Sequence, residues 1–266
     1  MKSAELKQAL AAAVQAAKAA GKLMRGNLRA AKTVKEATSH DIKLELDVRC
    51  QKLIERTLRR VFPDIPLLGE EGDSGDTTAE SRWVVDPIDG TVNFAYGIPH
   101  ACVSVALQTQ SKARSADNGY QTIVGVVYDP FTEELWTAIR GQPARLNDET
   151  IHVSCRGKLN EAVLSTGFSK SKEHLEKSLP YFNNIAGRVR KIRIMGAAAL
   201  SFVYVATGRF DAYVERSVSL WDIAAGGLIV ECAGGEFWRE AIPGAHKFRI
   251  IVSNGRLRRQ LVKGWI

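Results

Sequence analysis

The stretch from residue 83 to residue 91 constrains this chain more than any other part of it. An apolar run at residues 83–85 predicts a short buried strand. Two aspartates follow, Asp86 and Asp89, with Pro87 between them. Because proline has a fixed φ and no N–H donor, we expect the strand to end at Pro87. Both carboxylates should therefore lie where a buried strand ends and the chain turns.

The turn after these aspartates carries Gly90 and Thr91. Glycine permits a tight turn and lets a ligand approach the backbone closely. We expect Thr91 to cap a helix that begins at Val92. Two hard oxygen ligands would then lie beside unused backbone N–H groups, and this combination suits a divalent cation that holds a phosphate.

A second acidic segment precedes this one. Residues 65–68 predict a short strand, and Glu70 and Glu71 follow it between two glycines. A glutamate pair in a surface turn is common, so this segment alone predicts little. Two short strands with acidic ends can, however, bring their carboxylates together. Because such a cluster would repel itself, a cation is its natural partner.

The rest of the chain predicts alternating helices and strands. Apolar residues at helical spacing favour helices over residues 3–28, 41–60, 197–206, 220–233 and 255–263. Short apolar or alternating runs favour strands over residues 101–108, 122–128, 134–139, 163–166, 189–194, 210–214 and 249–252. The polar segment 33–41 predicts a loop. We find no internal repeat and no linker between independent domains.

Three further positions carry polar groups that have both a functional and a structural explanation. Asp47 lies near the start of the second helix, where a lone aspartate is usually solvated. Asp222 lies in the first turn of the helix at 220–233, where a negative charge is favourable without any function. Residues 196–198 open a small-residue helix that would direct N–H groups toward a ligand. A tightly packed internal helix explains the same residues.

Charge and cysteine content narrow the possible partners. The net charge of +8, from 37 basic and 29 acidic residues, would suit an anionic substrate or nucleic acid. We interpret it as scattered surface charge, since the sequence contains no aromatic–basic RNA-binding motif. The four cysteines are far apart, which excludes a zinc-type pair and favours reduced thiols in the cytoplasm. Neither a signal peptide nor a membrane span is predicted.

Read together, the acidic segments resemble a known family. The blocks are Gly69-Glu70-Glu71, Asp86-Pro87-Ile88-Asp89-Gly90-Thr91 and Trp221-Asp222-Ile223-Ala224-Ala225-Gly226, with Asp47 upstream and residues 196–198 between. In these blocks the chain resembles the inositol monophosphatase family of magnesium-dependent, lithium-sensitive phosphatases. The resemblance implies a layered α/β/α/β/α sandwich. It also implies a single domain over 1–266, with halves of about 1–145 and 146–266 packed as one unit.

The resemblance implies a role for each matching residue. The implied ligands of two or three Mg²⁺ ions are Glu70, Asp86, the carbonyl of Ile88, Asp89 and Asp222. Glu70 also matches the residue that holds the attacking water, and Asp47 and Thr91 match the pair that activates it. The implied substrate-binding residues are Asp89, Gly90, Thr91, Gly196, Ala198, Glu215 and Asp222. Among these, Gly90 and Thr91 offer N–H groups to phosphate, and Glu215 contacts substrate hydroxyls.

The implied activity is magnesium-dependent hydrolysis of a small phosphate monoester, with inositol-1-phosphate as the leading substrate and lithium as an inhibitor. Ala197 and Ser201 depart from the residues that relatives often carry there, and both flank the substrate side. Fructose-1,6-bisphosphate, histidinol phosphate and 3'-phosphoadenosine 5'-phosphate therefore stay open as alternatives. A cytoplasmic homodimer without a membrane partner is expected from the family.

The sequence also shares features with two other classes of protein. The segment 86–91 superficially resembles the haloacid-dehalogenase phosphatases, which use an aspartate nucleophile. Those enzymes place one residue between their two aspartates, whereas two residues separate Asp86 from Asp89. The second class is a binding protein, since some bacterial relatives act with the transcription machinery and a basic surface could bind RNA. The intact acidic blocks favour catalysis, and an additional RNA or transcription role stays open.

Overall fold

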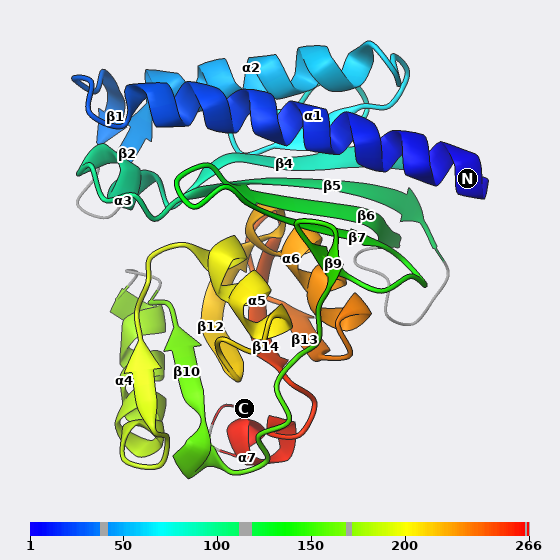
Figure 1. The fold of residues 1–266 in the computed structure, drawn as a ribbon. Coiled ribbons are helices and arrows are strands. Elements are labelled where there is room, and N and C mark those ends of the chain that lie inside the picture. The colour runs from blue at the N-terminus through cyan, green and yellow to red at the C-terminus, as the bar shows by residue number, and fades with distance from the viewer. Residues whose placement is uncertain (38–41, 112–118, 169–171, 264, 266) are drawn as a thin grey trace.

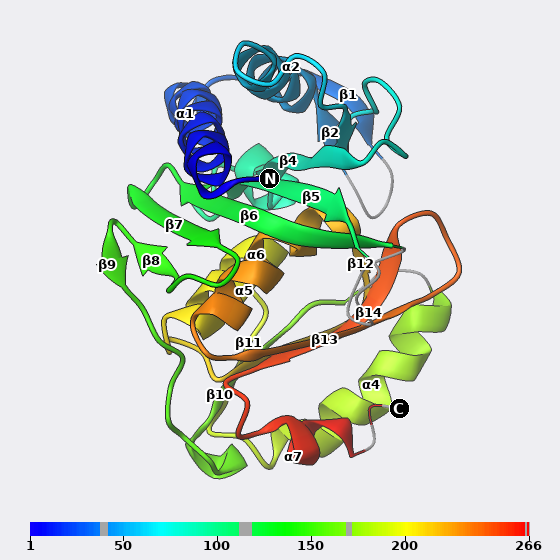
Figure 2. The same ribbon diagram turned by 90° about the vertical axis from the view of Figure 1, so that its right-hand side faces the viewer.

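The computed structural model describes residues 1–37, 42–111, 119–168, 172–263 and 265. Its elements form successive layers of helix, sheet, helix, sheet and helix (Figure 1, Figure 2). The α/β/α/β/α sandwich expected from the sequence is therefore confirmed. In the described part of the chain, no helix is both long enough and apolar enough to cross a membrane.

The larger sheet carries Asp86 and Asp89, and Glu70 follows its first strand directly. Within the described ranges it has seven strands, in the order β3-β4-β5-β6-β7-β8-β9. β3 and β4 are parallel, and the later neighbours are antiparallel. The strands are β3 (Leu67–Gly69), β4 (Ser81–Asp89), β5 (Cys102–Gln110), β6 (Tyr120–Asp129), β7 (Glu134–Ile139), β8 (Arg145–Leu146) and β9 (Glu149–Thr150). β4 and β5 are buried along most of their length because helices cover both faces of the sheet.

The smaller sheet is built from the second half of the chain. Among the described residues it has five strands, in the order β11-β10-β12-β14-β13. β10 is parallel to both of its neighbours, whereas β14 is antiparallel to β12 on one side and to β13 on the other. The strands are β10 (Val163–Thr166), β11 (Lys191–Arg193), β12 (Ala212–Ser219), β13 (Glu236–Ala241) and β14 (Lys247–Ser253). The register places the end of β10, at Thr166, beside Val214 in the middle of β12.

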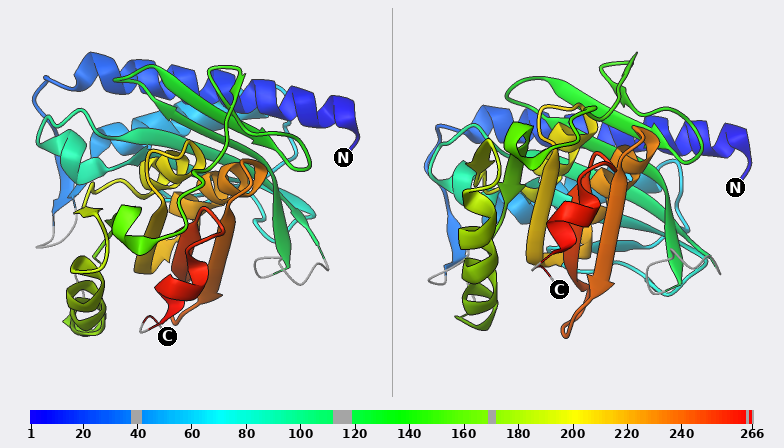
Figure 3. Two further views of the ribbon diagram at one scale, coloured as in Figure 1. Left: turned by 60° about the horizontal axis from the view of Figure 1, so that its bottom comes forward. Right: turned by 90° about the horizontal axis from the view of Figure 1, so that it is seen from below.

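Helices occupy three layers around these sheets. α1 (Ser3–Asn27) and α2 (Glu45–Arg59) cover the outer face of the large sheet, and α5 (Ala198–Ala206) and α6 (Leu220–Cys232) fill the space between the sheets. Figure 3 shows α4 (Lys172–Ala186, green) and α7 (Arg258–Val262, red) on the face of the small sheet that points away from the large sheet. α3 (Thr91–Ala95) and a 3-10 turn (Leu159–Glu161) complete the helices. Apart from Asp222 and Glu231, the residues of α6 are apolar or small on all sides, as expected for a helix that both sheets contact.

Two local predictions in the first half of the chain were wrong. The predicted loop 33–41 contains β1 (Val34–Ala37), which pairs with β2 (Ile42–Leu44), so the second helix starts at Glu45; residues 38–41 lie outside the described ranges. β4 also continues through Pro87 to Asp89. The register between β4 and β5 shifts there, and a bulge tolerates proline because it interrupts the ladder of hydrogen bonds.

The small sheet also differs from the prediction. β12 extends to Ser219, so Glu215 lies within a strand, at a register shift, and not at the strand's end. β13 was not predicted, because its mixed residues give no clear alternation of polar and apolar side chains. It forms as an edge strand through hydrogen bonds with β14.

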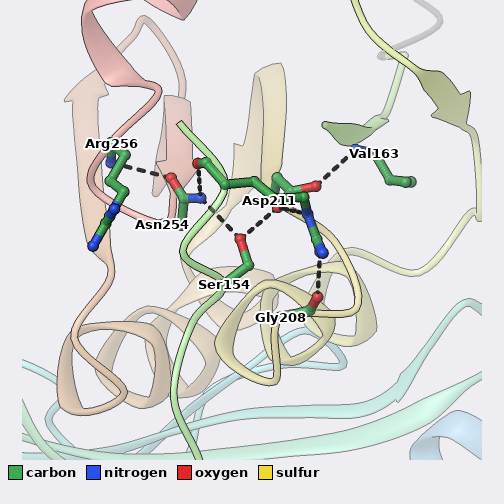
Figure 4. A network of polar contacts seen from close by, with 7 residues as sticks. Ser154, Val163, Gly208, Asp211, Asn254 and Arg256 are labelled. Atoms are coloured by element: carbon green, nitrogen blue, oxygen red, sulfur yellow. Dashed lines mark hydrogen bonds and ion pairs between the residues drawn. The ribbon is translucent and has the colours of Figure 1, made fainter. Parts of the chain in front are cut away.

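A buried polar network attaches the segment 151–158, which connects the two sheets, to the small sheet (Figure 4). At its centre Asp211 is fully buried. Its carboxylate accepts hydrogen bonds from the Ser154 hydroxyl, the Arg156 guanidinium (2.7 Å) and the Val163 N–H (2.7 Å). The Asn254 amide donates to the Ser154 hydroxyl (2.9 Å) and to the Arg156 carbonyl (2.8 Å).

The division of the chain into a single domain with two halves stays a prediction.

Candidate metal centre and active site

A β-bulge brings Asp86 and Asp89 to one face of the large sheet. In a regular strand, residues three positions apart point to opposite faces. Here Asp86 pairs with Ser104 and Asp89 pairs with Cys102, so β4 carries one more residue than β5 across this interval. Because Ser104 and Cys102 share a face of β5, their partners on β4 share it too. Asp86 is 2% exposed and Asp89 is 7% exposed.

Glu70 reaches the same place through the parallel pairing of β3 and β4. Gly69 is in register with Val85, so the next residues, Glu70 and Asp86, emerge side by side. The Glu70 N–H donates to the Val85 carbonyl (3.2 Å), which fixes the turn after β3. Glu70 is half-buried, and its side chain is hydrogen-bonded with Asp86.

Asp222 approaches from the first turn of α6. The Ser219 N–H donates to its Oδ2 (2.8 Å), as in a helix capping box. The Ser104 hydroxyl on β5 donates to the Trp221 carbonyl (3.1 Å), which ties the start of α6 to the face that carries the aspartates. One carboxylate oxygen each from Asp86, Asp89 and Asp222 lies within 4.8 Å of the others.

The N-terminus of α5 is directed at Asp89. The Ala198 and Ala199 N–H groups donate to the two Asp89 oxygens, at 3.0 Å and 2.8 Å. The sequence suggested that N–H groups at 196–198 would face a ligand, whereas the structure shows two N–H groups of this helix start bound to a protein carboxylate. Sequence reasoning missed this contact because it joins residues more than 100 positions apart.

The turn after β4 presents the backbone around Gly90. This glycine has a φ of +92°, and a Cβ there would lie 2.9 Å from the His100 carbonyl, so a larger residue would be strained. Gly90 is also the N-cap residue of α3, which corrects the prediction that Thr91 caps a helix from Val92. The Thr91 hydroxyl instead donates to the Ile88 carbonyl (2.9 Å).

Asp47 is buried and not solvated, in contrast to the usual case for a lone helix aspartate. Its side chain is 2% exposed, and its Oδ2 accepts a hydrogen bond from the Leu44 N–H (2.7 Å) at the start of α2. Burial and the charge of Asp222 raise the pKa of Glu70, and the charge of Asp47 adds to this shift. The field of Asp47 therefore reaches the acidic cluster, which consists of Glu70, Asp86, Asp89 and Asp222. Its role in activating water stays a prediction.

The carboxylates of the acidic cluster disfavour each other's charged forms. Burial and the charge of Asp222 raise the pKa of Glu70 to about 8. Burial, then the charges of Glu70 and Asp89, raise the pKa of Asp86 well above its usual range. Burial and Asp222 raise the pKa of Asp89 to about 7, although the N–H groups from α5 act against this. A bound cation would remove the mutual repulsion.

The donor set fits magnesium. The cluster offers carboxylate oxygens, and the Ile88 carbonyl lies in the same turn. Hard oxygen ligands of this kind are typical of Mg²⁺ and Ca²⁺ sites, whereas zinc and copper favour nitrogen or sulfur. The Cys102 thiol contacts Asp89 (3.5 Å), but burial raises its pKa well above the usual range and keeps it protonated. Glu70, Asp86, Asp89 and Asp222 can therefore hold a magnesium ion.

A cavity of about 380 Å³ adjoins the cluster. Its lining includes five of the seven residues predicted to bind substrate, namely Asp89, Asp222, Gly196, Ala198 and Glu215, whereas Gly90 and Thr91 are not part of the lining. Both positions that depart from the family pattern line it as well, Ala197 and Ser201. The arrangement places a site for cations next to a chamber large enough for a small organic molecule.

Glu215 is supported from two neighbouring strands. The Tyr213 hydroxyl, two residues earlier on the same face of β12, donates to its Oε2. A Cβ on Gly167, just after β10, would lie 1.9 Å from the same oxygen, so this close approach requires glycine. Burial raises the pKa of Glu215 to about 8, and the Tyr213 hydrogen bond acts against the shift.

Sequence reasoning missed Tyr213 and Lys247 as cavity residues. Alternation along β12 could have indicated Tyr213, since it lies two positions from Glu215. No local signal indicates Lys247, because only the pairing of β14 with β12 places it opposite Ser219. Both residues line the cavity.

Comparison with known proteins gives a consistent result. The model of the inositol monophosphatase family matches residues 5–259. An inositol-1-monophosphatase of Rhizobium meliloti is 42% identical over 194 residues, which cover 72% of this chain and 69% of that protein. The Nus factor SuhB of Xylella fastidiosa is 39% identical over 225 residues, which cover 84% of this chain and 78% of the relative.

Solved structures extend this similarity to the fold. The extragenic suppressor protein SuhB from Bartonella henselae superposes with a TM-score of 0.85 at 33% identity, covering 96% of each chain. A structure described as an IMPase/NADP phosphatase complexed with Mg²⁺ and phosphate has a TM-score of 0.76 at 25% identity, covering 93% of this chain and 90% of the other. From its acidic blocks, its layered fold and these matches, the chain belongs to the inositol monophosphatase family.

Proposed function

We propose that this protein hydrolyses a small phosphate monoester with the help of two or three Mg²⁺ ions, and that inositol-1-phosphate is its leading substrate. The observation that carries the proposal is the convergence of Asp86, Asp89 and Asp222, whose oxygens lie within 4.8 Å of one another. Such a cluster of buried like charges is costly unless cations compensate it. Membership of a phosphatase family supports the same reaction class.

In this proposal, Glu70, Asp86, Asp89 and Asp222 would hold Mg²⁺, which would supply positive charge to the phosphoryl oxygens and lower the pKa of the attacking water. Glu70, which follows β3 beside Asp86, holds that water, the Thr91 hydroxyl orients it, and the Asp47 carboxylate accepts its proton. The Gly90 and Thr91 N–H groups bind phosphate oxygens at the start of α3. In-line attack then needs no covalent intermediate with the protein.

The alcohol part of the substrate occupies the adjoining cavity. Glu215 is a hydrogen-bond acceptor there, and Gly196 and Ala198 form a small-residue wall that leaves room for a ring. An acceptor for hydroxyl groups suits a polyol such as inositol. The relative named inositol-1-monophosphatase supports this substrate. The expected homodimer, cytoplasmic location and lithium inhibition stay predictions.

A phosphate-release panel tests the proposal. Purified protein with Mg²⁺ is assayed with inositol-1-phosphate, fructose-1,6-bisphosphate, histidinol phosphate and 3'-phosphoadenosine 5'-phosphate. We expect release from at least one of them, highest with inositol-1-phosphate, and none when chelator removes Mg²⁺. No release from any substrate would contradict the enzyme proposal, and a different best substrate would correct only its specificity.

A second candidate function is binding to RNA or to the transcription machinery. Relatives named Nus factor SuhB motivate it, and so does an exposed basic surface formed by Lys52, Arg56 and Arg59 of α2 and by Arg60, which follows the helix. This surface lies on the outer helix layer, on the side of the large sheet away from the acidic cluster. Salt-dependent RNA binding by a variant with a disabled metal site would support this role. Absence of binding at low salt would remove RNA as a partner.

A further inference from the structure

Lys247 is the one cationic side chain among the described residues that line the cavity. It is the first residue of β14 and lies opposite Ser219, the last residue of β12. Its half-buried ammonium donates to the Ser219 hydroxyl (2.7 Å). Since Ser219 also caps α6 next to Asp222, sheet register fixes a positive charge beside the acidic cluster.

The positive charge of Lys247 acts on Glu215, and both side chains line the same cavity. A lysine ammonium has three N–H donors, and one of them serves Ser219. A neutral polyol needs hydrogen bonds but no positive charge. An ammonium held at a cavity wall, partly shielded from water, is instead matched by an anionic oxygen, which forms a stronger, charge-assisted hydrogen bond.

The carboxylates of the cavity cannot bind such an oxygen themselves. Asp89 and Asp222 belong to the candidate metal centre, where cations would attract the phosphate that is hydrolysed. Glu215 accepts hydrogen bonds from hydroxyl groups and offers no positive charge to an anion. A second anionic group on the substrate therefore has one complementary partner among the described lining residues, which is Lys247.

We propose that Lys247 forms a subsite for a second phosphate on the alcohol part of the substrate. The accepted substrates then extend from neutral polyol phosphates to polyol bisphosphates, with hydroxyl groups at Glu215 and the second phosphate at Lys247. This proposal rests on the proposed function, since the same cavity holds the leaving group.

Binding measurements test the subsite without relying on turnover. Dissociation constants for fructose-1,6-bisphosphate and inositol-1-phosphate are measured with Mg²⁺ in protein that carries Asp47→Asn to prevent hydrolysis. Adding Lys247→Met should shift the ratio of the two constants by roughly tenfold or more against the bisphosphate. Any disturbance of the Ser219 cap affects both ligands alike and cancels in the ratio. Lys247→Arg should restore the ratio, and Lys158→Met, at an exposed lysine outside the cavity, should not change it.

The outcomes separate this proposal from the proposed function. An unchanged ratio in Lys247→Met, or no binding of fructose-1,6-bisphosphate to the Asp47→Asn parent, would overturn the subsite. Failure of the wild-type protein to release phosphate from any substrate would overturn the proposed function instead, while the ratio would still report whether Lys247 selects a second phosphate.

Discussion

Two buried carboxylate sites in this protein differ in what surrounds them. Asp211, in the network that attaches the connecting segment to the small sheet, accepts hydrogen bonds from Ser154, Arg156 and Val163. Asp86, in the large sheet, accepts one from the Ile88 N–H (3.0 Å) but lies beside other carboxylates. Both aspartates are nearly inaccessible to solvent, at 0% and 2% exposed.

This difference identifies Asp211 as part of a structural site and Asp86 as part of a ligand-binding site. The charge on Asp211 is satisfied within the protein, so its burial contributes to a fixed geometry. The charge on Asp86 is opposed by its neighbours, so the protein alone does not stabilise it. A site that the folded chain leaves electrostatically incomplete is completed by a ligand, and here the ligand that fits is a divalent cation.

The largest expected effect concerns Asp211. Asp211→Ala leaves buried donors without an acceptor, so we expect the free energy of unfolding to fall by about 3 kcal/mol. Urea denaturation measures this change, with Asp64→Ala at an exposed aspartate as the control. Mg²⁺ affinity at temperatures where the variant is folded should stay as in the wild type. A loss below about 1 kcal/mol would show that the network is not the structural site described here.

At Asp86 we expect the opposite result, which is a loss of activity together with a gain in stability. In Asp86→Asn the amide oxygen can still accept from Ile88, while the negative charge is lost. Mutation of residues that only hydrogen-bond to a metal ligand typically lowers activity about 10–100-fold. Because Asp86 is itself a proposed ligand, we expect kcat/KM for phosphate release to fall by more than roughly a hundredfold. The metal-free variant should be more stable than the metal-free wild type, since one repulsive charge is removed. Asp64→Asn is the matched control. A variant that is less stable and fully active would reverse the comparison.

A smaller effect is expected on the substrate side. Gly167→Ala would place a Cβ 1.9 Å from the Glu215 carboxylate and displace it. We expect KM for inositol-1-phosphate to rise roughly tenfold, as for the loss of one charged hydrogen bond, with little change in Mg²⁺ affinity. Gly187→Ala is the control, because no atom lies within 4 Å of its added Cβ. Equal KM values in the two variants would remove Glu215 from substrate binding.

The stability of the metal-free protein should also depend on pH. The pKa of Glu70 is raised to about 8 and that of Asp89 to about 7, whereas unfolded carboxyls titrate near ~4. The native state therefore binds more protons than the unfolded state between these values. Stability should fall as pH rises from about 4 to about 8, and saturating Mg²⁺ should flatten this slope. Denaturation midpoints across this range measure it, and a rise in stability with pH would contradict the repulsive cluster.

The sequence predicted much of the site because its signals are local. Asp86 and Asp89 follow an apolar strand, Glu70 follows a neighbouring one, and Asp222 opens a helix. Each position could be assigned to the end or start of an element before any contact was known. The layered fold followed from the family resemblance, which spans those same blocks.

What the sequence did not predict depends on register between distant strands. The bulge that continues β4 past Pro87, and thereby turns Asp86 and Asp89 to one face, exists only in the pairing with β5. The placement of Lys247 beside Ser219 needs the register of β14 against β12. The bonds from α5 to Asp89 likewise join separate halves of the chain. Local periodicity carries no information about any of these.

The most direct test is the Mg²⁺ affinity of the metal-free wild-type protein and of Asp222→Asn, measured by isothermal titration calorimetry. In Asp222→Asn the side-chain oxygen can still cap α6, so the fold should be retained while one metal-ligating charge is lost. The account predicts saturable Mg²⁺ binding by the wild type that weakens by more than roughly a hundredfold in the variant. Equal affinities in the two proteins, or no saturable binding by the wild type, would contradict it.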